Sequence, residues 1–271
     1  MPNGDKPLPV SSSSPPRFPR EQQELFHGVL QHLLERKVPF VVSGAFALQA
    51  HTGIWRDTKD LDLFIPARHV PGAMDSLREQ GFECEVADPV WLAKAHTGEY
   101  FVDLITGMSN AVIVVDQSWV DRGVTRNVFG LQVKVLAPEE LVASKLFVTR
   151  RERFDGADIA HVLRGAGARM DWDRMLQLVG EHWEMLLWAL LLFHYTYPQD
   201  RQSVPQAVWD DLLGRLRESL ASPDPRAPFR GSLIDPMMFA IDVNEWGMEN
   251  LLEGYRARRQ PKLPEPCNPA A

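Results

Sequence analysis

Residues 41–65 read VVSGAFALQAHTGIWRDTKDLDLFI, and this pattern predicts a buried strand end, a turn, a short helix and a second strand. The turn at residues 43–45 is Ser-Gly-Ala and has almost no side-chain bulk. Side chains alternate faces along a strand, so residues two apart share a face. Asp60 and Asp62 therefore point the same way at the start of the second strand, while the apolar residues between and after them point into a core.

Two carboxylates one strand repeat apart suit a divalent cation. Their Cα atoms are roughly 6.5–7 Å apart, which lets both side chains converge on one ion. Mg²⁺ prefers oxygen ligands and is usually held by one or two carboxylates together with substrate phosphates. Backbone N–H groups at the helix start formed by Ser43, Gly44 and Ala45 attract anions, phosphate above all. The sequence thus predicts a phosphate-sized space beside a metal-binding pair; the alternative is a strand whose acids only face water.

The composition is that of an ordinary soluble protein. Of 271 residues, 45% are hydrophobic and 24% are charged, which is typical of globular chains with one or two domains. The formal net charge of −7 argues against a protein that coats nucleic acid non-specifically. Two cysteines give no disulfide framework and no zinc-ligand spacing. The longest apolar run, residues 185–193, is far shorter than the roughly 20 residues of a membrane helix, so we expect a cytoplasmic protein without a membrane partner.

A third carboxylate lies on a later predicted strand, residues 99–105. Asp103 shares one face of that strand with Phe101 and Ile105. An unpaired buried carboxylate is costly, so Asp103 should face a metal ion, another cation or water at the end of the sheet. Residues 89–96, which precede this strand, read as a short helix or loop. The other predicted strands are residues 38–42, 82–86, 112–115 and 131–136.

The chain divides into four parts by pattern. Residues 1–19 are rich in Pro and Ser and are expected to form a disordered arm. Residues 20–137 interleave helices with short strands, which predicts a small mixed sheet with helices packed on it, an α/β core. Residues 138–256 are helical in pattern, with one helix expected over 236–245, and form an all-helical C-terminal domain. Residues 257–271 are Pro-rich and are expected to be a flexible tail.

The first motif resembles a known family signature. The residues that carry the resemblance are Gly44, Ala45, Ala47, His51, Gly53, Arg56, Thr58, Asp60 and Asp62. They resemble the nucleotidyltransferase superfamily that includes DNA polymerase beta. The match is nearest to its bacterial branch of minimal, aminoglycoside-type and AbiE-type toxin nucleotidyltransferases. In that family a Gly-Ser or Gly-Gly turn holds the nucleotide phosphates and Asp-x-Asp holds Mg²⁺. The resemblance implies the same roles for the Ser43-Gly44-Ala45 turn and for Asp60 and Asp62.

The same resemblance assigns roles to residues further along the chain. Asp103 matches the family's third carboxylate, which completes metal binding or accepts the proton of the attacking hydroxyl. Residues 138–145 and 155–158 resemble segments that follow the core in AbiE-type relatives. Lys145 is then a candidate for contact with nucleotide phosphate, the alternative being a surface lysine. The three arginines in residues 150–153 are either a solvated surface or a site for triphosphate or RNA.

The resemblance implies a Mg²⁺-dependent nucleotidyltransferase that binds an NTP such as ATP. Such an enzyme transfers NMP to a hydroxyl of tRNA, a protein or a small molecule, with release of pyrophosphate. The resemblance also implies a toxin–antitoxin role, with an antitoxin-like protein as partner. The family's Gly-Ser or Gly-Gly is Gly44-Ala45 here, and this departure motivates the alternative of a weak or inactive nucleotide- or partner-binding module. A metal-dependent phosphohydrolase ranks last, because the expected His-Asp clusters are missing.

Overall fold

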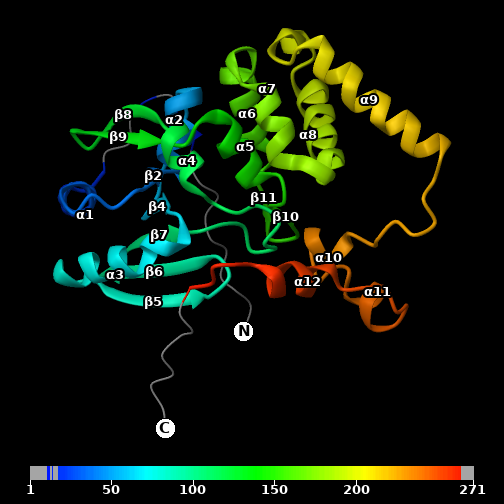
Figure 1. Ribbon diagram of the computed structural model, residues 1–271. Coiled ribbons are helices and arrows are strands. Elements are labelled where there is room, and N and C mark those ends of the chain that lie inside the picture. Colours follow the sequence, from blue (N-terminus) through cyan, green and yellow to red (C-terminus); the bar gives the residue numbers. More distant parts are fainter. Residues whose placement is uncertain (1–10, 13, 15–17, 264–271) are drawn as a thin grey trace.

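A computed structural model describes residues 11–12, 14 and 18–263 and is built on one seven-stranded sheet (Figure 1). Its strands are β2 (Val41–Val42), β4 (Asp60–Phe64), β5 (Glu83–Asp88), β6 (Leu92–Thr97), β7 (Tyr100–Ile105), β8 (Val124–Val128) and β9 (Leu131–Val135). The strand order is β5-β6-β7-β4-β2-β9-β8. The β4–β7 and β2–β9 pairs are parallel and the other pairs are antiparallel. The sheet is therefore mixed, as the sequence predicts.

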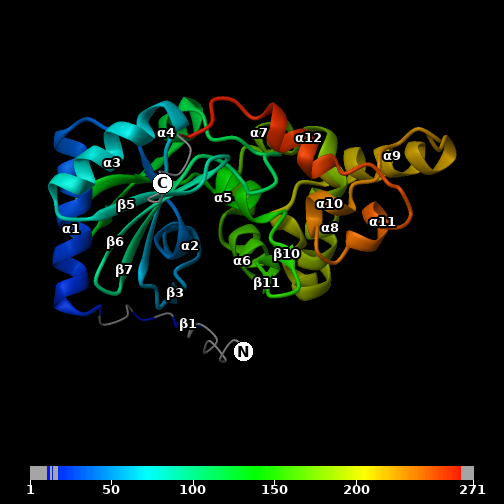
Figure 2. The same cartoon turned by 90° about the horizontal axis from the view of Figure 1, so that it is seen from below.

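Helices flank the sheet and make up most of the second half of the chain (Figure 2). They are α1 (Arg20–Glu35), α2 (Gly44–Thr52), α3 (Val70–Glu79), α4 (Gln117–Arg122), α5 (Pro138–Lys145), α6 (Gly156–Ala166), α7 (Trp172–Val179), α8 (Trp183–Thr196), α9 (Gln206–Ala221), α10 (Gly231–Ile234), α11 (Ala240–Asn244) and α12 (Leu251–Arg258). Two short antiparallel ladders join β1 (Ser11–Ser12) to β3 (Trp55–Arg56) and β10 (Thr149–Arg150) to β11 (Arg153–Phe154). No helix among the described residues is long and apolar enough to span a membrane.

The strand that carries the two predicted ligands alternates as expected. Leu61 and Leu63 are fully buried in the core, while Asp60 is exposed and Asp62 is partly buried on the opposite face. Helix α2 begins directly after β2, so its first turn lies beside the middle of β4, the neighbour of β2 in the sheet. The predicted strand–turn–helix–strand arrangement is thus the one that the chain adopts.

In the segment that reads as a short helix or loop, residues 89–96, the last five residues instead form most of β6, the strand next to the edge strand β5. The strand is paired along both edges, to β5 and to β7. This pairing buries Leu92, Ala93 and Ala95, so tertiary contacts outweigh the low intrinsic strand preference of Ala and Lys. The prediction is confirmed for the turn at residues 89–91 and wrong for residues 92–96, and the error hides Lys94, the side chain that faces Asp103.

Two further local predictions are wrong. Residues 112–115 form no strand, and only an isolated bridge joins Gly107 to Val114. The helix expected over 236–245 shrinks to the five residues of α11. Strand β8 is an addition that the sequence pattern misses, because three of its five residues are exposed and carry no apolar alternation.

The C-terminal strap, which we define as residues 231–263, folds back onto the sheet (Figures 1 and 2). Helix α12 ends at Arg258, and two residues after it, Arg259 and Leu263, are buried. The Leu263 N–H donates to the Pro89 carbonyl at 2.8 Å. The ordered tail up to Leu263 differs from the flexible one predicted from residue 257. Of the other predicted flexible regions, residues 1–10, 13, 15–17 and 264–271 lie outside the described part.

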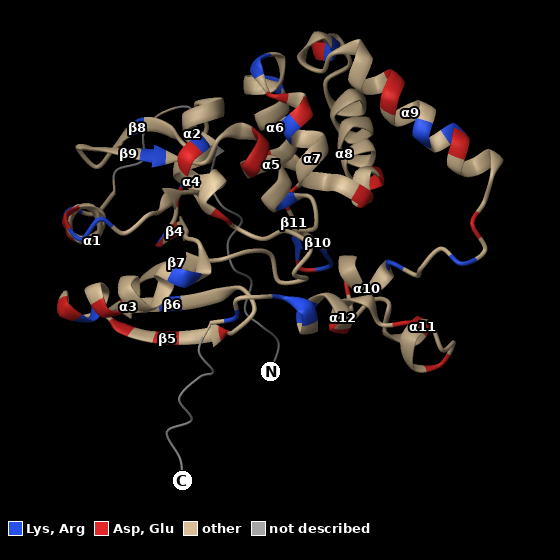
Figure 3. Ribbon diagram, viewed as in Figure 1, with Lys and Arg blue, Asp and Glu red and all other residues tan. Residues whose placement is uncertain are grey.

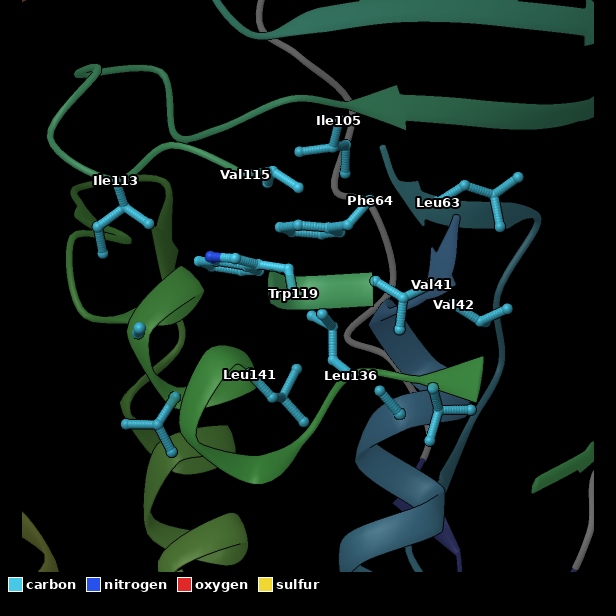
Figure 4. Close-up of a cluster of buried hydrophobic side chains, with 14 of the residues drawn as sticks. Val41, Val42, Leu63, Phe64, Ile105, Ile113, Val115, Trp119, Leu136 and Leu141 are labelled. Carbon is cyan, nitrogen blue, oxygen red and sulfur yellow. The ribbon is translucent and has the colours of Figure 1, made fainter. Parts of the chain in front are cut away.

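Aromatic stacking fixes the end of β4 in the core (Figure 4). The rings of Phe64 and Trp119 lie parallel, with centroids 5.6 Å apart and planes 5° apart. Trp119 is 1% exposed. Offset stacking of this kind adds to the free energy gained from burying the two rings. Helix α4, which carries Trp119, therefore supports the strand end that approaches the cavity described below.

Trp119→Ala is expected to lower the free energy of unfolding by about 3–5 kcal/mol, because it removes a buried indole and leaves a cavity against Phe64. Urea unfolding followed by circular dichroism measures the change. Trp246, which is 64% exposed, is the matched control, and Trp246→Ala should change stability by about 0.5 kcal/mol or less. Equal losses in the two variants would contradict a stabilising role for the burial of Trp119 against Phe64.

Candidate active site

Asp62 and Asp103 are brought side by side by the parallel pairing of β4 and β7. The register places Asp62 opposite Asp103 and Asp60 opposite Phe101. Residues paired in this way point to the same face of the sheet, so the three predicted carboxylates share one face. Asp62 and Asp103 line a common cavity. Asp60 is exposed one strand repeat away and is not part of the cavity lining.

The Gly44 turn presses directly against Asp62. Gly44 has φ +56°, in the left-handed region, and a Cβ there would lie 2.0 Å from Asp62 Oδ2. Only glycine fits such a position. The Ser43 N–H donates to the Asp62 carbonyl at 2.8 Å, which ties the turn to β4. Ser43 and Gly44 line the cavity, whereas Ala45 is partly buried in α2 outside it.

The electrostatics of the two carboxylates differ. Removal from water raises the pKa of Asp62 to about 6, and the neighbouring carboxylates of Asp103 and Asp60 add to the rise. Among the described residues, no hydrogen-bond donor reaches the Asp62 carboxylate. Asp103 is held by Lys94, whose Nζ donates to Oδ1 at 2.9 Å and to Oδ2 at 3.1 Å. One of the paired acids thus has a cation partner and the other has none within hydrogen-bonding distance.

Lys145 is buried rather than a surface lysine. Its Nζ lies 2.6 Å from an oxygen of Asp155 and 2.8 Å from one of Asp158. Asp158 also pairs with Arg56 from β3, and Arg153 Nε donates to Asp155 Oδ1 at 3.1 Å. Burial acts to raise the pKa of Asp155, but Lys145 and Arg153 outweigh it and hold that pKa below its ordinary value. This network joins β3 and the β10–β11 hairpin to α5 and α6 at the edge of the cavity.

The cavity has a volume of about 220 Å³ and combines an acidic floor, basic side chains and an apolar wall. Arg150 and Arg153 of the β10–β11 hairpin supply part of its positive charge, and Figure 3 shows these basic segments next to α10. Arg151 is outside the lining, and its N–H donates to Asp235 at 3.3 Å. The apolar wall consists of Phe64, Trp91, Ile105, Met108, Phe147, Val148, Leu233 and Ile234.

The C-terminal strap supplies the last two of those wall residues. The Leu233 carbonyl accepts a hydrogen bond from Asn110 Nδ2 at 3.0 Å. Arg256 donates to the Asp88 carboxylate at 3.0 Å and to the Ser109 carbonyl at 2.6 Å, and Arg259 donates to a buried carbonyl at 3.0 Å. These contacts hold α10 over the cavity.

The donor set suits a hard divalent cation. Two carboxylates lie next to each other at the cavity floor, and one of them, Asp62, is partly buried, has no hydrogen bond among the described residues and is raised in pKa. A magnesium ion needs only one or two carboxylates when substrate phosphates complete its shell. The described part of the chain contains no group of three or more His, Cys, Asp or Glu that could hold a metal ion by itself. Asp62 and Asp103 therefore fit an ion that arrives together with a phosphate ligand.

Sequence reasoning missed Lys94, the two carboxylates that hold Lys145, and the strap. The signal for Lys94 was the alternation Leu-Ala-Lys-Ala-His-Thr in residues 92–97, which places Leu, Lys and His on one face. The strap gave no comparable signal, because its helices are short and its contacts with the core span more than 100 residues of sequence.

Residues 22–179, more than half of the chain, match the family described as "Nucleotidyl transferase of unknown function (DUF2204)". Among solved structures, the chain is similar to the antibiotic-resistance factor ANT(2'')-Ia, with 18% identity and a TM-score of 0.44, over 65% of this chain and 98% of that one. It is also similar to an antigenic nucleotidyltransferase-like protein from Paracoccidioides brasiliensis, with 20% identity and a TM-score of 0.40, over 74% of this chain and 99% of that one. A tRNA-processing enzyme matches 91% of this chain and 77% of its own, with 14% identity and a TM-score of 0.33. A comparison with curated protein sequences gives no match.

Proposed function

The chain belongs to the nucleotidyl transferase family that its residues 22–179 match, and we propose that it is a Mg²⁺-dependent enzyme transferring NMP from an NTP to an acceptor hydroxyl. In this reaction the hydroxyl oxygen bonds to the α-phosphorus, the bond from that phosphorus to the bridging oxygen breaks, and pyrophosphate leaves. The observation that carries the proposal is the register of Asp62 with Asp103, because it supports a paired-carboxylate floor directly beside the Gly44 turn.

Asp62 and Asp103, with Asp60 at the outer edge, are the proposed metal ligands. When bound, Mg²⁺ would neutralise charge on the phosphates and on the attacking and leaving oxygens. The protein's own contribution is to hold these carboxylates on two adjacent strands, a rigid support that keeps the reacting groups in position. Asp62 gains most from the ion, because an ionised carboxylate without a nearby donor is unfavourable in a desolvated site.

The triphosphate is proposed to lie between the Gly44 turn and the β10–β11 hairpin. Ser43 and Gly44 line the cavity at the start of α2, where backbone N–H groups favour anions. Arg150 and Arg153 line it from the other side and present guanidinium groups that suit phosphate oxygens. Lys145 is engaged by two carboxylates, so we assign it to positioning Asp155, the N-cap residue of α6, as well as to adding positive charge near the phosphates.

The apolar wall is the proposed site for the base or for the acceptor. Trp91, Met108 and Phe147 are large and face the same cavity as the carboxylates, which suits a flat or partly apolar group. The acceptor classes carried forward are tRNA, a protein hydroxyl and a small molecule. The AbiE-type resemblance adds an antitoxin-like protein partner as a further proposal.

The direct test incubates the protein with each α-labelled NTP, Mg²⁺ and whole-cell extract. Label that appears on RNA, on protein or on small molecules, together with pyrophosphate, supports the transfer and identifies the acceptor class. NTP binding measured by calorimetry, with no transfer to any fraction, would instead support the nucleotide-binding module that the Gly44-Ala45 turn motivates. Consumption of NTP without an acceptor would indicate phosphohydrolysis.

A further inference from the structure

A short segment of the C-terminal strap exposes large apolar side chains to solvent. We call these side chains the Met patch, and each of them is between 45% and 83% exposed: Met237, Met238, Ile241, Trp246 and Met248. Single exposed apolar residues are common on protein surfaces, whereas several together mark an interaction site. The patch lies outside the matched residues 22–179, so the family match assigns no role to it.

Backbone turns on both sides of α11 hold the Met patch together. The N–H groups of the two methionines before α11 both donate to Asp235 Oδ1 at 3.0 Å. After α11 the Trp246 N–H donates to the Ile241 carbonyl at 3.2 Å, so the chain folds back on the helix. The five side chains therefore belong to one compact segment of the surface.

The charge around the Met patch is of one sign. Residues 231–255 contain five Asp and Glu residues and no Lys or Arg, and Figure 3 shows no basic residue on α11. Within the described part of the chain, the side chains of Asp242, Glu245 and Glu249 form no ion pair and no hydrogen bond. These three carboxylates are therefore free to pair with cations of another molecule.

The arginines nearest to this segment along the chain do not neutralise it. Arg230 precedes the segment and pairs with Glu184 of α8 at 3.3 Å. Arg256 follows it and donates to the Asp88 carboxylate at the end of β5. Both guanidinium groups are thus engaged by acids of other elements, and the Met patch combines apolar area with uncompensated negative charge.

This combination favours one class of partner. Nucleic acid and anionic membrane surfaces carry negative charge, which the acids around the patch repel. Residues 231–263 form helices and turns but no strand, so they offer no strand edge to an added β-strand. An amphipathic helix with an apolar stripe flanked by Lys and Arg matches both features, and Met side chains adapt readily to such a stripe.

We propose that the Met patch is a docking site for a basic amphipathic helix of a partner protein. The Met and Trp side chains pack against the apolar stripe of that helix. The carboxylates of Asp242, Glu245 and Glu249 pair with its Lys or Arg residues. Docking at this surface needs no catalysis, so the inference stands apart from the proposed transfer.

Fluorescence anisotropy with a labelled peptide tests the docking. The probe is two copies of the heptad LKKLLKL, which places Leu on one helix face and Lys on the other, and it is titrated with the full chain at about 0.15 M salt. The wild-type protein is expected to bind the peptide at least about tenfold more tightly than Trp246→Ala, because an aromatic anchor is lost. The combined variant Asp242→Asn, Glu245→Gln and Glu249→Gln should weaken binding by about the same factor, because three ion pairs are lost.

Two matched variants control for general effects. Tyr195→Ala removes an aromatic side chain of α8 that is even more exposed than Trp246, and it should bind the peptide like the wild-type protein. The combined variant Asp210→Asn, Glu218→Gln and Asp224→Asn makes the same change in net charge at exposed positions on and after α9. It should also bind like the wild-type protein, because the lost charges are not at the patch.

Three results of the titration would overturn the inference: unchanged binding by Trp246→Ala, equal weakening by the α9 charge variant, or equally tight binding of a peptide with Glu in place of Lys. Sedimentation of the protein alone covers a different occupant. A dimer that Trp246→Ala dissociates would assign the patch to a second copy of the chain and overturn the proposal. Binding to phosphatidylglycerol vesicles that Trp246→Ala abolishes would overturn it in favour of a membrane surface.

Discussion

Asp62→Asn is expected to lower NMP transfer by about 10³-fold or more, because an interaction with the metal ion worth several kcal/mol is lost. The Asp62 side chain lies against the Gly44 turn, lines the cavity and has a raised pKa. Asparagine keeps the shape and removes the charge. Transfer of label from α-labelled NTP to the acceptor fraction measures the loss, at saturating Mg²⁺ and nucleotide.

The same variant should be more stable than the wild-type protein when metal is absent. The pKa of Asp62 is about 6 in the folded protein, against an ordinary value of 3.8. The folded state therefore binds this proton more tightly than the unfolded chain, so ionisation of Asp62 costs stability increasingly as pH rises from about 4 to about 6 and fully above that. We expect Asp62→Asn to raise the free energy of unfolding by about 1–3 kcal/mol at pH 8 in EDTA, and to change it little near pH 4.

Asp57→Asn provides the control, since it makes the same charge change five residues earlier at an exposed position. It should leave both transfer and the pH dependence of stability unchanged. Retained transfer in Asp62→Asn would remove the metal assignment. An unchanged unfolding free energy at pH 8 would show that the carboxylate is solvated in the folded protein.

The site could be predicted as far as it depends on local pattern. Asp60 and Asp62 share a face because strands repeat every two residues, and that relation needs no knowledge of the fold. The pairing of Asp62 with Asp103 is a long-range contact across 41 residues, and the sequence indicated it only through a family resemblance. The same resemblance implied membership of the AbiE-type branch. The family match supports only the broader nucleotidyl transferase family.

What sequence reasoning missed depends on contacts made after the chain has folded. Lys94 lies in a segment with low strand preference that becomes a strand because β5 and β7 pair with it on both edges. Lys145 has the periodicity of an ordinary helical lysine, and its burial follows from Asp155 and Asp158, which another helix and its cap supply. The strap reaches the cavity through hydrogen bonds from Asn110 and Arg256 that no periodicity encodes.

Gly44→Ala should damage both the fold and the reaction. A Cβ at this position would overlap Asp62 Oδ2, at 2.0 Å, and the backbone would be held at φ +56°. The left-handed conformation alone costs a non-glycine residue about 1–2 kcal/mol, and the overlap forces either the turn or the carboxylate to move. We expect a loss of about 2–4 kcal/mol in unfolding free energy and a fall in transfer of about 10²-fold, because a misplacement of about 1 Å is enough. Thermal unfolding and label transfer measure the two effects.

Gly53→Ala separates strain from overlap. Gly53 ends the same helix α2 with φ +74°, but nothing lies within 4 Å of its Cβ position. It should cost about 1 kcal/mol of stability and leave transfer intact. If Gly44→Ala behaved like Gly53→Ala in both measurements, contact with Asp62 would not be the reason for glycine at position 44.

A double-mutant cycle with Asp62→Ala sharpens the comparison. That change removes Oδ2 and Cγ of residue 62, so its nearest remaining side-chain atom, Cβ, is 3.3 Å from the Cβ that alanine would place at position 44. The destabilisation by Gly44→Ala should then shrink to about the backbone strain alone, a coupling of at least about 1 kcal/mol between turn and carboxylate.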